Sequence, residues 1–263
     1  MDIKFNHSIM RIAHCALRIA ISFLVFSNAF ATSSYSILSN WRPLIGGNLG
    51  AAISSDVGKS QDFPIQNPIT DEFYDYSADN NTQGKLLYGA FVGAEKEFSQ
   101  KFYLQLGFDF NQEQPFSAEG SFVQGADAQS ADTYHYSYRI ITRQLLAEGK
   151  LLYPVKKRWY PYLLVGLGAS FNNSYHYRTD VPPLLTLTRT YSNNSTTSFS
   201  YAVGVGVDVD VISHLRLGLG YRFTDFGKAS LGQGNIDGTE VSGTLTQSHL
   251  YTNEVLAQLT YIF

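Results

Sequence analysis

Few residues of this chain have types and spacing suited to chemistry, and the clearest are His135 and Ser137. They lie two apart in a segment typical of a β-strand, so both side chains are expected on one face. An imidazole can activate a nearby hydroxyl as a nucleophile when a carboxylate orients its ring. The sequence does not place an acidic residue beside this pair. We therefore expect no catalytic residues, and we keep a hydrolase centred on His135 and Ser137 as an alternative.

Other apparent motifs lack the rest of their sites. The triplet DFG at 225–227 matches a kinase signature, but no catalytic loop or Gly-rich partner accompanies it. Asp208 and Asp210 lack the remaining ligands of a calcium loop, and the histidines lack zinc-ligand spacing. We predict no metal site and no cofactor.

The composition narrows the class of protein. The chain has 263 residues, of which 44% are hydrophobic and 16% charged, and its formal net charge is −3. A negative chain without a basic patch is not expected to bind nucleic acid. Residues 1–31 are typical of a secretory signal peptide, with an apolar core at 19–26 and an Ala-Phe-Ala cleavage site. An uncleaved anchor is the alternative, but this apolar run is far shorter than the ~20 residues of a spanning helix.

The rest of the chain, 32–263, is predicted to be one domain made of strands. About eight segments alternate apolar and small or polar residues, each about long enough for a tilted strand to cross a bilayer. Between Phe199 and Val211, for example, aromatic and valine residues occupy the odd positions, and Ser, Ala, Gly and Asp the even ones. The predicted strands are 41–54, 85–98, 102–112, 134–153, 159–172, 199–211, 215–224 and 254–263.

The connections between these strands alternate in length. Short turns lie near 99–101, 154–158 and 212–214, whereas the long connections are 55–84, 112–133, 173–198 and 225–248. Short periplasmic turns and long outer loops are typical of outer-membrane barrels, which have an even strand number. Opposed residues of an antiparallel pair share a face. The pairs that keep every apolar face in phase are Phe98 with Phe102, Tyr153 with Trp159, and Val211 with Leu215.

The small-residue face is predicted to line the lumen. It carries few charges, whereas the outer surface of a soluble protein is normally rich in them. The apolar face, which often begins or ends in an aromatic residue, would then contact lipid. No run of 18 apolar residues follows the leader, so a membrane form must be a closed barrel. The predicted fold is therefore all-β: an eight-stranded antiparallel up-and-down transmembrane β-barrel with short periplasmic turns and long extracellular loops.

Charges on the lumen face are expected to pair, because a buried charge without a partner is costly. Strand 85–98 would add Glu95 and Glu97, and Asp210 should lie opposite Arg216. A gated ion path and a plugged lumen held by ion pairs are both compatible with such charges, and we favour the plug. The predicted lumen ion-pair residues are Glu148, Lys150, Asp208, Asp210, Arg216, Arg222 and Glu254.

Two cations fall on the lipid side of this scheme. Lys96 is close to the lower rim, where its stem can reach water. Arg143 would lie near the outer interface, where it could meet lipopolysaccharide phosphates. Alternatively, a β-bulge changes the phase of the strand above it, because 134–140 carry aromatic and apolar residues on the opposite parity. The sequence leaves both options open.

The last strand carries a resemblance to a known family. Its alternation, Val255-x-Ala257-x-Leu259-x-Tyr261-x-Phe263, and the Tyr-Arg-Phe at 221–223 before DFG resemble the small outer-membrane β-barrel superfamily, the opacity-protein and OmpA-like barrels of Gram-negative bacteria. The resemblance implies location in the outer membrane. It also implies that Leu259, Tyr261 and Phe263 form a C-terminal signal for the barrel assembly machinery, and it implies roles in adhesion, surface antigenicity or envelope integrity.

The sequence thus predicts a non-enzymatic outer-membrane barrel whose surface loops contact a host, a matrix or the envelope. Expected partners are outer-membrane lipid, lipopolysaccharide and the assembly machinery. The alternatives are a narrow pore and a lipid A-modifying hydrolase, because His135 and Ser137 are similar to the His-x-Ser arrangement of lipid A deacylases. An apolar patch at 181–185 is either a contact surface or a self-packed part of its loop.

Overall fold

The computed structural model consists of strands and turns, and it describes residues 40–64, 73–99, 101–125, 132–156, 158–182, 189–236 and 238–263. The predicted signal peptide lies outside these residues. Within them, no helix is long and apolar enough to cross a membrane.

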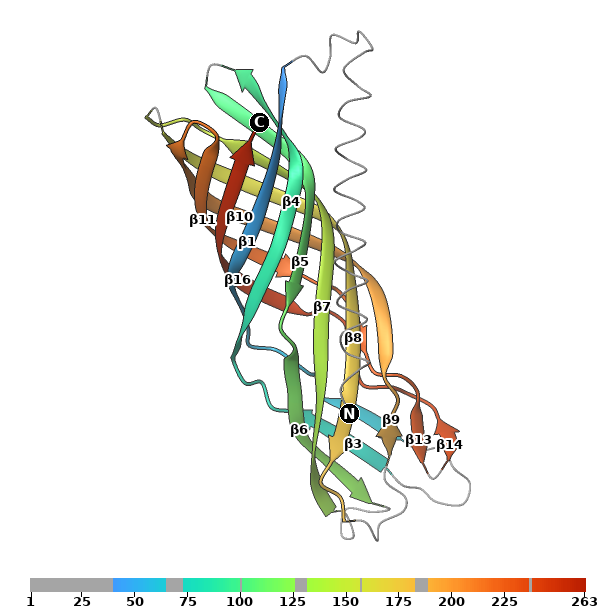
Figure 1. The fold of residues 1–263 in the computed structure, drawn as a ribbon. Helices are drawn as coiled ribbons and strands as arrows, with labels where there is room; N and C mark the ends of the chain where they lie inside the picture. Colours follow the sequence, from blue (N-terminus) through green and yellow to red (C-terminus); the bar gives the residue numbers. More distant parts are fainter. Residues whose placement is uncertain are drawn as a thin grey trace, which may run out of the picture. The chain divides into compact units, whose positions relative to one another are not determined.

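Eight antiparallel strands form a closed ring (Figure 1). β1 pairs with β4 on one side and with β16 on the other, so the first and last strands of the ring meet. The other neighbours follow chain order. Because the ring is closed, no strand of it has an unpaired edge. The ring strands are β1 (Trp41–Ser54), β4 (Gln83–Ser99), β5 (Phe102–Glu113), β7 (Asp132–Leu152), β8 (Trp159–Thr179), β10 (Asn194–Ile212), β11 (Leu215–Asp225) and β16 (Tyr251–Ile262).

The predicted up-and-down barrel is confirmed, and its strands run further outward than the sequence indicated. β8 continues to Thr179 instead of ending at Asn172. The polar composition near Asn172 suggested a loop, but its side-chain amide donates to the backbone oxygens of Phe226 and Lys228, at 2.8 Å each. A polar residue with such partners can remain within a paired strand.

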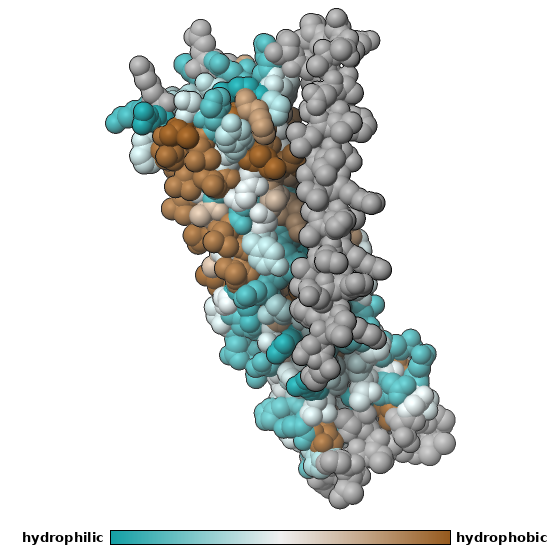
Figure 2. All heavy atoms as spheres, viewed as in Figure 1, coloured by the Kyte–Doolittle hydropathy of each residue, from teal (hydrophilic) through white to brown (hydrophobic). Residues whose placement is uncertain are grey.

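The apolar face of the barrel points outward. On β10, Val205 is 51% exposed, whereas its inward neighbours Ala202 and Asp208 are at most 1% exposed. Figure 2 shows the resulting band of apolar side chains on the barrel wall. The inside of the barrel is therefore the small-residue face.

The three predicted turn pairings are wrong in detail, although the faces stay in phase. Bulges between Glu97 and Ser99 and between Asp210 and Ile212 leave Phe98 and Val211 without an opposed residue. At the third turn, the Tyr153 N–H donates to the Pro161 oxygen at 2.9 Å, so Tyr153 does not oppose Trp159. Each bulge adds one residue to one strand, which a simple count of turn residues does not reveal.

The long connections contain strands of their own and form a lobe at the barrel end opposite the C-terminus (Figure 1). β6 (Phe116–Gly125) pairs with the outer part of β7, β3 (Phe73–Ala78) pairs with β6, and β2 (Gln61–Pro64) pairs with β3. The short strands of the later connections are β9 (Thr190–Tyr191), β12 (Ala229–Ser230), β13 (Gly234–Ile236), β14 (Thr239–Val241) and β15 (Thr246–Gln247).

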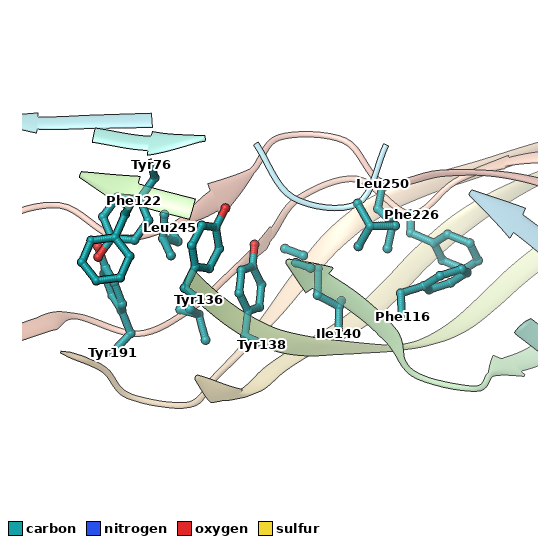
Figure 3. Packing of buried hydrophobic residues seen from close by; sticks show 14 of the residues in the cluster. Tyr76, Phe116, Phe122, Tyr136, Tyr138, Ile140, Tyr191, Phe226, Leu245 and Leu250 are labelled. Atoms are coloured by element: carbon teal, nitrogen blue, oxygen red, sulfur yellow. The ribbon is translucent and has the colours of Figure 1, made fainter. Parts of the chain in front are cut away.

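The lobe has its own hydrophobic core (Figure 3). Tyr76 stacks on Phe122 with ring centroids 5.1 Å apart and meets Tyr136 edge-on at 5.2 Å. Burial raises the pKa of Tyr76 and of Tyr191 far above that of an ordinary tyrosine, so both phenols stay neutral. Each large side chain buried in this way contributes about 1.5–3 kcal/mol. The outer connections are thus packed together.

Arg189 links three of these connections. Its guanidinium donates to the backbone oxygens of Ser242 and Gly243. It also lies over the Phe63 ring, with 4.4 Å from Cζ to the ring centroid. Residues before β9, before β3 and after β14 are therefore held by one side chain.

The phase of β7 is continuous, which decides between the two options for Arg143. Even-numbered residues of β7 point inward along the whole strand, from Tyr136 and Ile140 to Glu148. Arg143 therefore points outward and is exposed. The bulge lies on the neighbouring β8 instead, where His176 has a positive φ of 57°.

We expect the outward face of β10 to tolerate charge only near its outer end. Val205 lies at the centre of the apolar run from Phe199 to Val211, so Val205→Arg should lower the free energy of unfolding by about 2–4 kcal/mol. Thr197→Arg, on the same face just beyond that run, should cost at most about 1 kcal/mol. Denaturant unfolding in lipid vesicles measures both. Equal costs would contradict a lipid-facing role for this surface.

Candidate functional site

The lumen contains a network of ion pairs that begins near the periplasmic end. Arg216 on β11 lies opposite Asp210 on β10, and its Nε donates to Asp210 Oδ1 at 2.7 Å. Its Nη1 donates to Glu95 Oε2 on β4 at 2.5 Å. Arg42 at the rim also pairs with Glu95. Glu97, by contrast, is exposed at the rim.

A lysine occupies the middle of the lumen. Lys150 on β7 lies 3.5 Å from Asp208 Oδ2 on β10 and donates to Gln258 Oε1 on β16 at 2.5 Å. Its Nζ is also 4.2 Å from the centroid of the Tyr162 ring. The contacts with Asp208 and Gln258 join strands that are not neighbours in the ring.

An arginine forms the outer layer of the network. The Arg222 Nε donates to Glu254 Oε2 at 2.6 Å, and its Nη1 donates to Asp109 Oδ2 at 2.8 Å. Glu148 Oε2 lies 3.9 Å from the same Nη1. Asn48 completes the layer by donating to Asp109 at 2.7 Å. Because Arg222 is on β11 and Asp109 on β5, this pair spans the barrel.

The sequence reasoning missed two lumen carboxylates. Asp109 and Glu113 are both buried inward on β5. The signal for Asp109 was present, because it alternates with Phe108 and Phe110. The same structure places all the predicted ion-pair residues on the lumen side. Their cross-barrel contacts form a polar network in the lumen, which we call the plug.

We expect the plug to stabilise the barrel through its outer layer. Arg222→Met leaves Glu254 and Asp109 buried without their cation, so the free energy of unfolding should fall by about 3–5 kcal/mol. Denaturant unfolding in vesicles is the measurement. Arg158→Met removes an exposed arginine at a periplasmic turn and should change stability by less than about 0.5 kcal/mol. If the two variants unfold alike, these pairs do not hold the barrel together.

A cleft of about 410 Å³ lies on the outer lobe around the predicted His135 and Ser137. Both side chains are on the outward face of β7, opposite to the face that packs in the lobe core. Ser137 lies between Glu119 of β6 and Arg178 of β8 in the cross-strand register. The cleft is lined by Asp79, Glu119, Gly120, His135, Tyr136, Ser137, Arg178, Thr179 and Asp180.

The bulge on β8 explains how Arg178 reaches this cleft. Before it, even-numbered residues such as Ser174 point inward. After His176, Tyr177 packs against the lobe core and Arg178 is exposed beside Ser137. The register between β7 and β8 shifts by one residue between the pairs Ser137 with Arg178 and Arg139 with Tyr175, as a bulge on β8 requires.

The cleft brings together residue types that hydrolysis needs, but it does not connect them. Asp180 is the acid that the sequence did not place, and its Oδ1 accepts the backbone N–H of His135 at 2.7 Å. In the described ranges, neither the His135 imidazole nor the Ser137 hydroxyl has a hydrogen bond. The arrangement is therefore a polar cleft in which the side chains of His135, Ser137 and Asp180 are not hydrogen-bonded to one another. No group of three or more His, Cys, Asp or Glu among the described residues is placed to hold a metal ion.

The predicted assembly signal lies on the outward face of the last strand. Leu259, Tyr261 and Phe263 are 50%, 43% and 63% exposed. The Phe263 N–H donates to the Pro43 oxygen of β1 at 3.0 Å, beside the closing seam of the ring. Lys96, which the sequence placed on the lipid side together with Arg143, lies 5.8 Å from the centroid of the Trp41 ring at the rim.

Comparison with known proteins gives one family and several similar folds. Residues 22–263 match the family described as outer membrane protein beta-barrel domain. A search among curated proteins found no match. Similar solved structures include the outer membrane protein OprG from Pseudomonas aeruginosa, with 13% identity, 85% of this chain and 96% of that chain covered, and a TM-score of 0.47.

Two further structures illustrate the range of this similarity. The outer membrane protease OmpT from Escherichia coli has 11% identity, covers 88% of this chain and 99% of its own, and has a TM-score of 0.45. The attachment invasion locus protein Ail of Yersinia pestis has 12% identity, 85% and 99% coverage, and a TM-score of 0.33. At such values the similarities carry no functional information.

Proposed function

The chain belongs to the outer membrane protein β-barrel family of bacterial outer-membrane proteins, and from this we propose that it is a non-enzymatic surface protein that presents its outer lobe for binding. The binding would serve adhesion to a host or matrix surface, or contacts within the cell envelope. The assembly machinery would read Leu259, Tyr261 and Phe263 at the end of the last strand.

The observation that carries this proposal is the packed lobe. Its aromatic core and the Arg189 contacts fix the outer connections relative to one another. A surface that is ordered before it binds loses less conformational entropy on binding. The apolar patch predicted at 181–185 is partly accounted for by self-packing, because Val181 packs against the lobe core, while 183–185 lie outside the described residues.

The lumen supports a structural role over a pore. Cross-barrel pairs such as Arg222 with Asp109 occupy the space that ions would use. Small barrels of about eight strands are normally filled by side chains. The narrow-pore alternative is therefore disfavoured.

The cleft is the place to test adhesion. Asp79→Asn combined with Glu119→Gln removes two exposed carboxylates and leaves the core intact. Adherence of bacteria to cultured cells and matrix-coated plates should fall by about tenfold if these groups contact the partner. Cells making the Arg158→Gln variant, which is changed at the opposite end, are the control. If cells with the unaltered chain adhere no better than cells without it, the adhesion role is wrong.

The hydrolase is the second candidate, because Asp180 and Glu119 lie in the cleft with His135 and Ser137. If the protein is non-enzymatic, incubation with the purified chain should leave the acyl content of lipopolysaccharide unchanged, as measured by mass spectrometry. The Ser137→Ala variant should give the same result. Acyl loss with the unaltered chain and with Ser121→Ala, but not with Ser137→Ala, would replace our proposal. Ser121 is a matched control because it lies opposite His135 on β6.

A further inference from the structure

Arg143 has an unusual position on the barrel wall. It is exposed on the outward face of β7, next to Leu145 of the apolar band. In the cross-strand register it lies between Gln112 on β5 and Phe171 on β8. A cation on a lipid-facing surface is costly unless it lies near an interface and finds an anion.

Hydrogen bonds hold this guanidinium in place on the outside of the barrel. Its Nε donates to Gln112 Oε1 at 3.1 Å, and the Gln112 amide donates to the Tyr88 hydroxyl at 2.7 Å. The two terminal nitrogens of Arg143 have no partner within the described ranges. Arg216 and Arg222 in the lumen, in contrast, are both paired with carboxylates. Arg143 is thus oriented by neutral groups and keeps its charge available.

The height of Arg143 matches the outer edge of the bilayer. Tyr153 directly follows the periplasmic end of β7, and Arg143 lies about ten residues further out, or roughly 33 Å along the strand. With a strand tilt of about 40°, this is a rise of roughly 25 Å, which is the usual height of the apolar band. Charged headgroups of the outer leaflet lie at that height.

A second free cation continues the same face outward. Arg139 is exposed on β7, four residues beyond Arg143 and on the same side. Four strand residues correspond to about 13 Å. Its side chain also has no partner in the part of the chain that the structure describes. The two arginines make a short column that leads from the membrane edge into the headgroup layer.

We propose that Arg143, with Arg139 above it, binds the phosphate groups of lipopolysaccharide in the outer leaflet. A guanidinium can donate two parallel hydrogen bonds to one phosphate. These charge-assisted hydrogen bonds are stronger at the edge of the bilayer than in water, because the dielectric constant is lower there. Phe171 and Tyr88 flank the site with surface for the acyl chains and sugar rings. The proposal rests on the outer-membrane location and is independent of adhesion.

The test uses the full chain in phosphatidylcholine nanodiscs, titrated with bisphosphorylated lipid A and followed by native mass spectrometry. Arg143→Gln should weaken lipid A binding by about tenfold, the usual effect of losing one charge-assisted contact. Arg139→Gln should weaken it less. Arg158→Gln, an equal change of charge at the periplasmic turn, should leave binding unchanged.

Additional measurements distinguish lipid phosphate from free phosphate, and a second variant shows whether weaker binding is caused by misfolding. Dephosphorylated lipid A should bind the unaltered chain weakly, about as weakly as bisphosphorylated lipid A binds the Arg143→Gln variant. Millimolar inorganic phosphate should not displace bisphosphorylated lipid A from the unaltered chain. Gln112→Leu, which removes the partner of Nε, should weaken binding by about threefold. Unchanged binding in both Arg143→Gln and Gln112→Leu, equal binding of dephosphorylated lipid A, or displacement by free phosphate would each overturn the proposal.

Discussion

Lipid offers no hydrogen bonds to a backbone, and this constraint determines the rest of the structure. Every strand in the bilayer must pair on both sides, so the sheet has to close on itself. The closure joins β1 to β16 through a register that runs from Leu44 with Ile262 to Ile53 with Asn253. Once the ring is closed, each strand has one face in lipid and one in a narrow interior. Side-chain alternation then becomes obligatory, because a one-residue slip would exchange the two faces.

The narrow interior explains why small residues and charges occur together on one face. Glycines leave room for large side chains from other strands: a Cβ at Gly206 would lie 2.4 Å from the Tyr162 hydroxyl. Tyr162 can therefore extend into the lumen, where its ring lies beside the Lys150 ammonium. Lys150 in turn reaches Asp208. The glycines and the ion pairs are thus parts of one arrangement, in which space left by one strand is filled by the polar side chains of others.

Much of the barrel could be predicted because its pattern is local. The alternation of residue types on β10 can be recognised without reference to any other strand. The register of the β10–β11 hairpin then places Asp210 opposite Arg216. Contacts across the barrel, such as Arg222 with Asp109, depend on strand tilt and stagger, which the sequence does not specify. The bulge at His176 was also hidden, since one inserted residue gives no compositional signal. The cleft residues around Ser137 come from four separate segments, so only Ser137 and its neighbour His135 could be found by spacing.

The lobe was the largest feature that sequence reasoning did not reveal, and β7 shows why. Its inward face is polar at Gln144 and Thr142, and becomes apolar at Ile140 and Tyr138 without any change of phase. One strand therefore contributes to two cores of opposite chemistry, a polar plug inside the membrane and an aromatic core beyond it. The two cores obey different rules, because the plug requires exact charge partners whereas the lobe requires filled apolar volume. Since the lobe core is filled by the lobe's own side chains and not by lipid, residues on the lobe surface can change without disturbing the barrel.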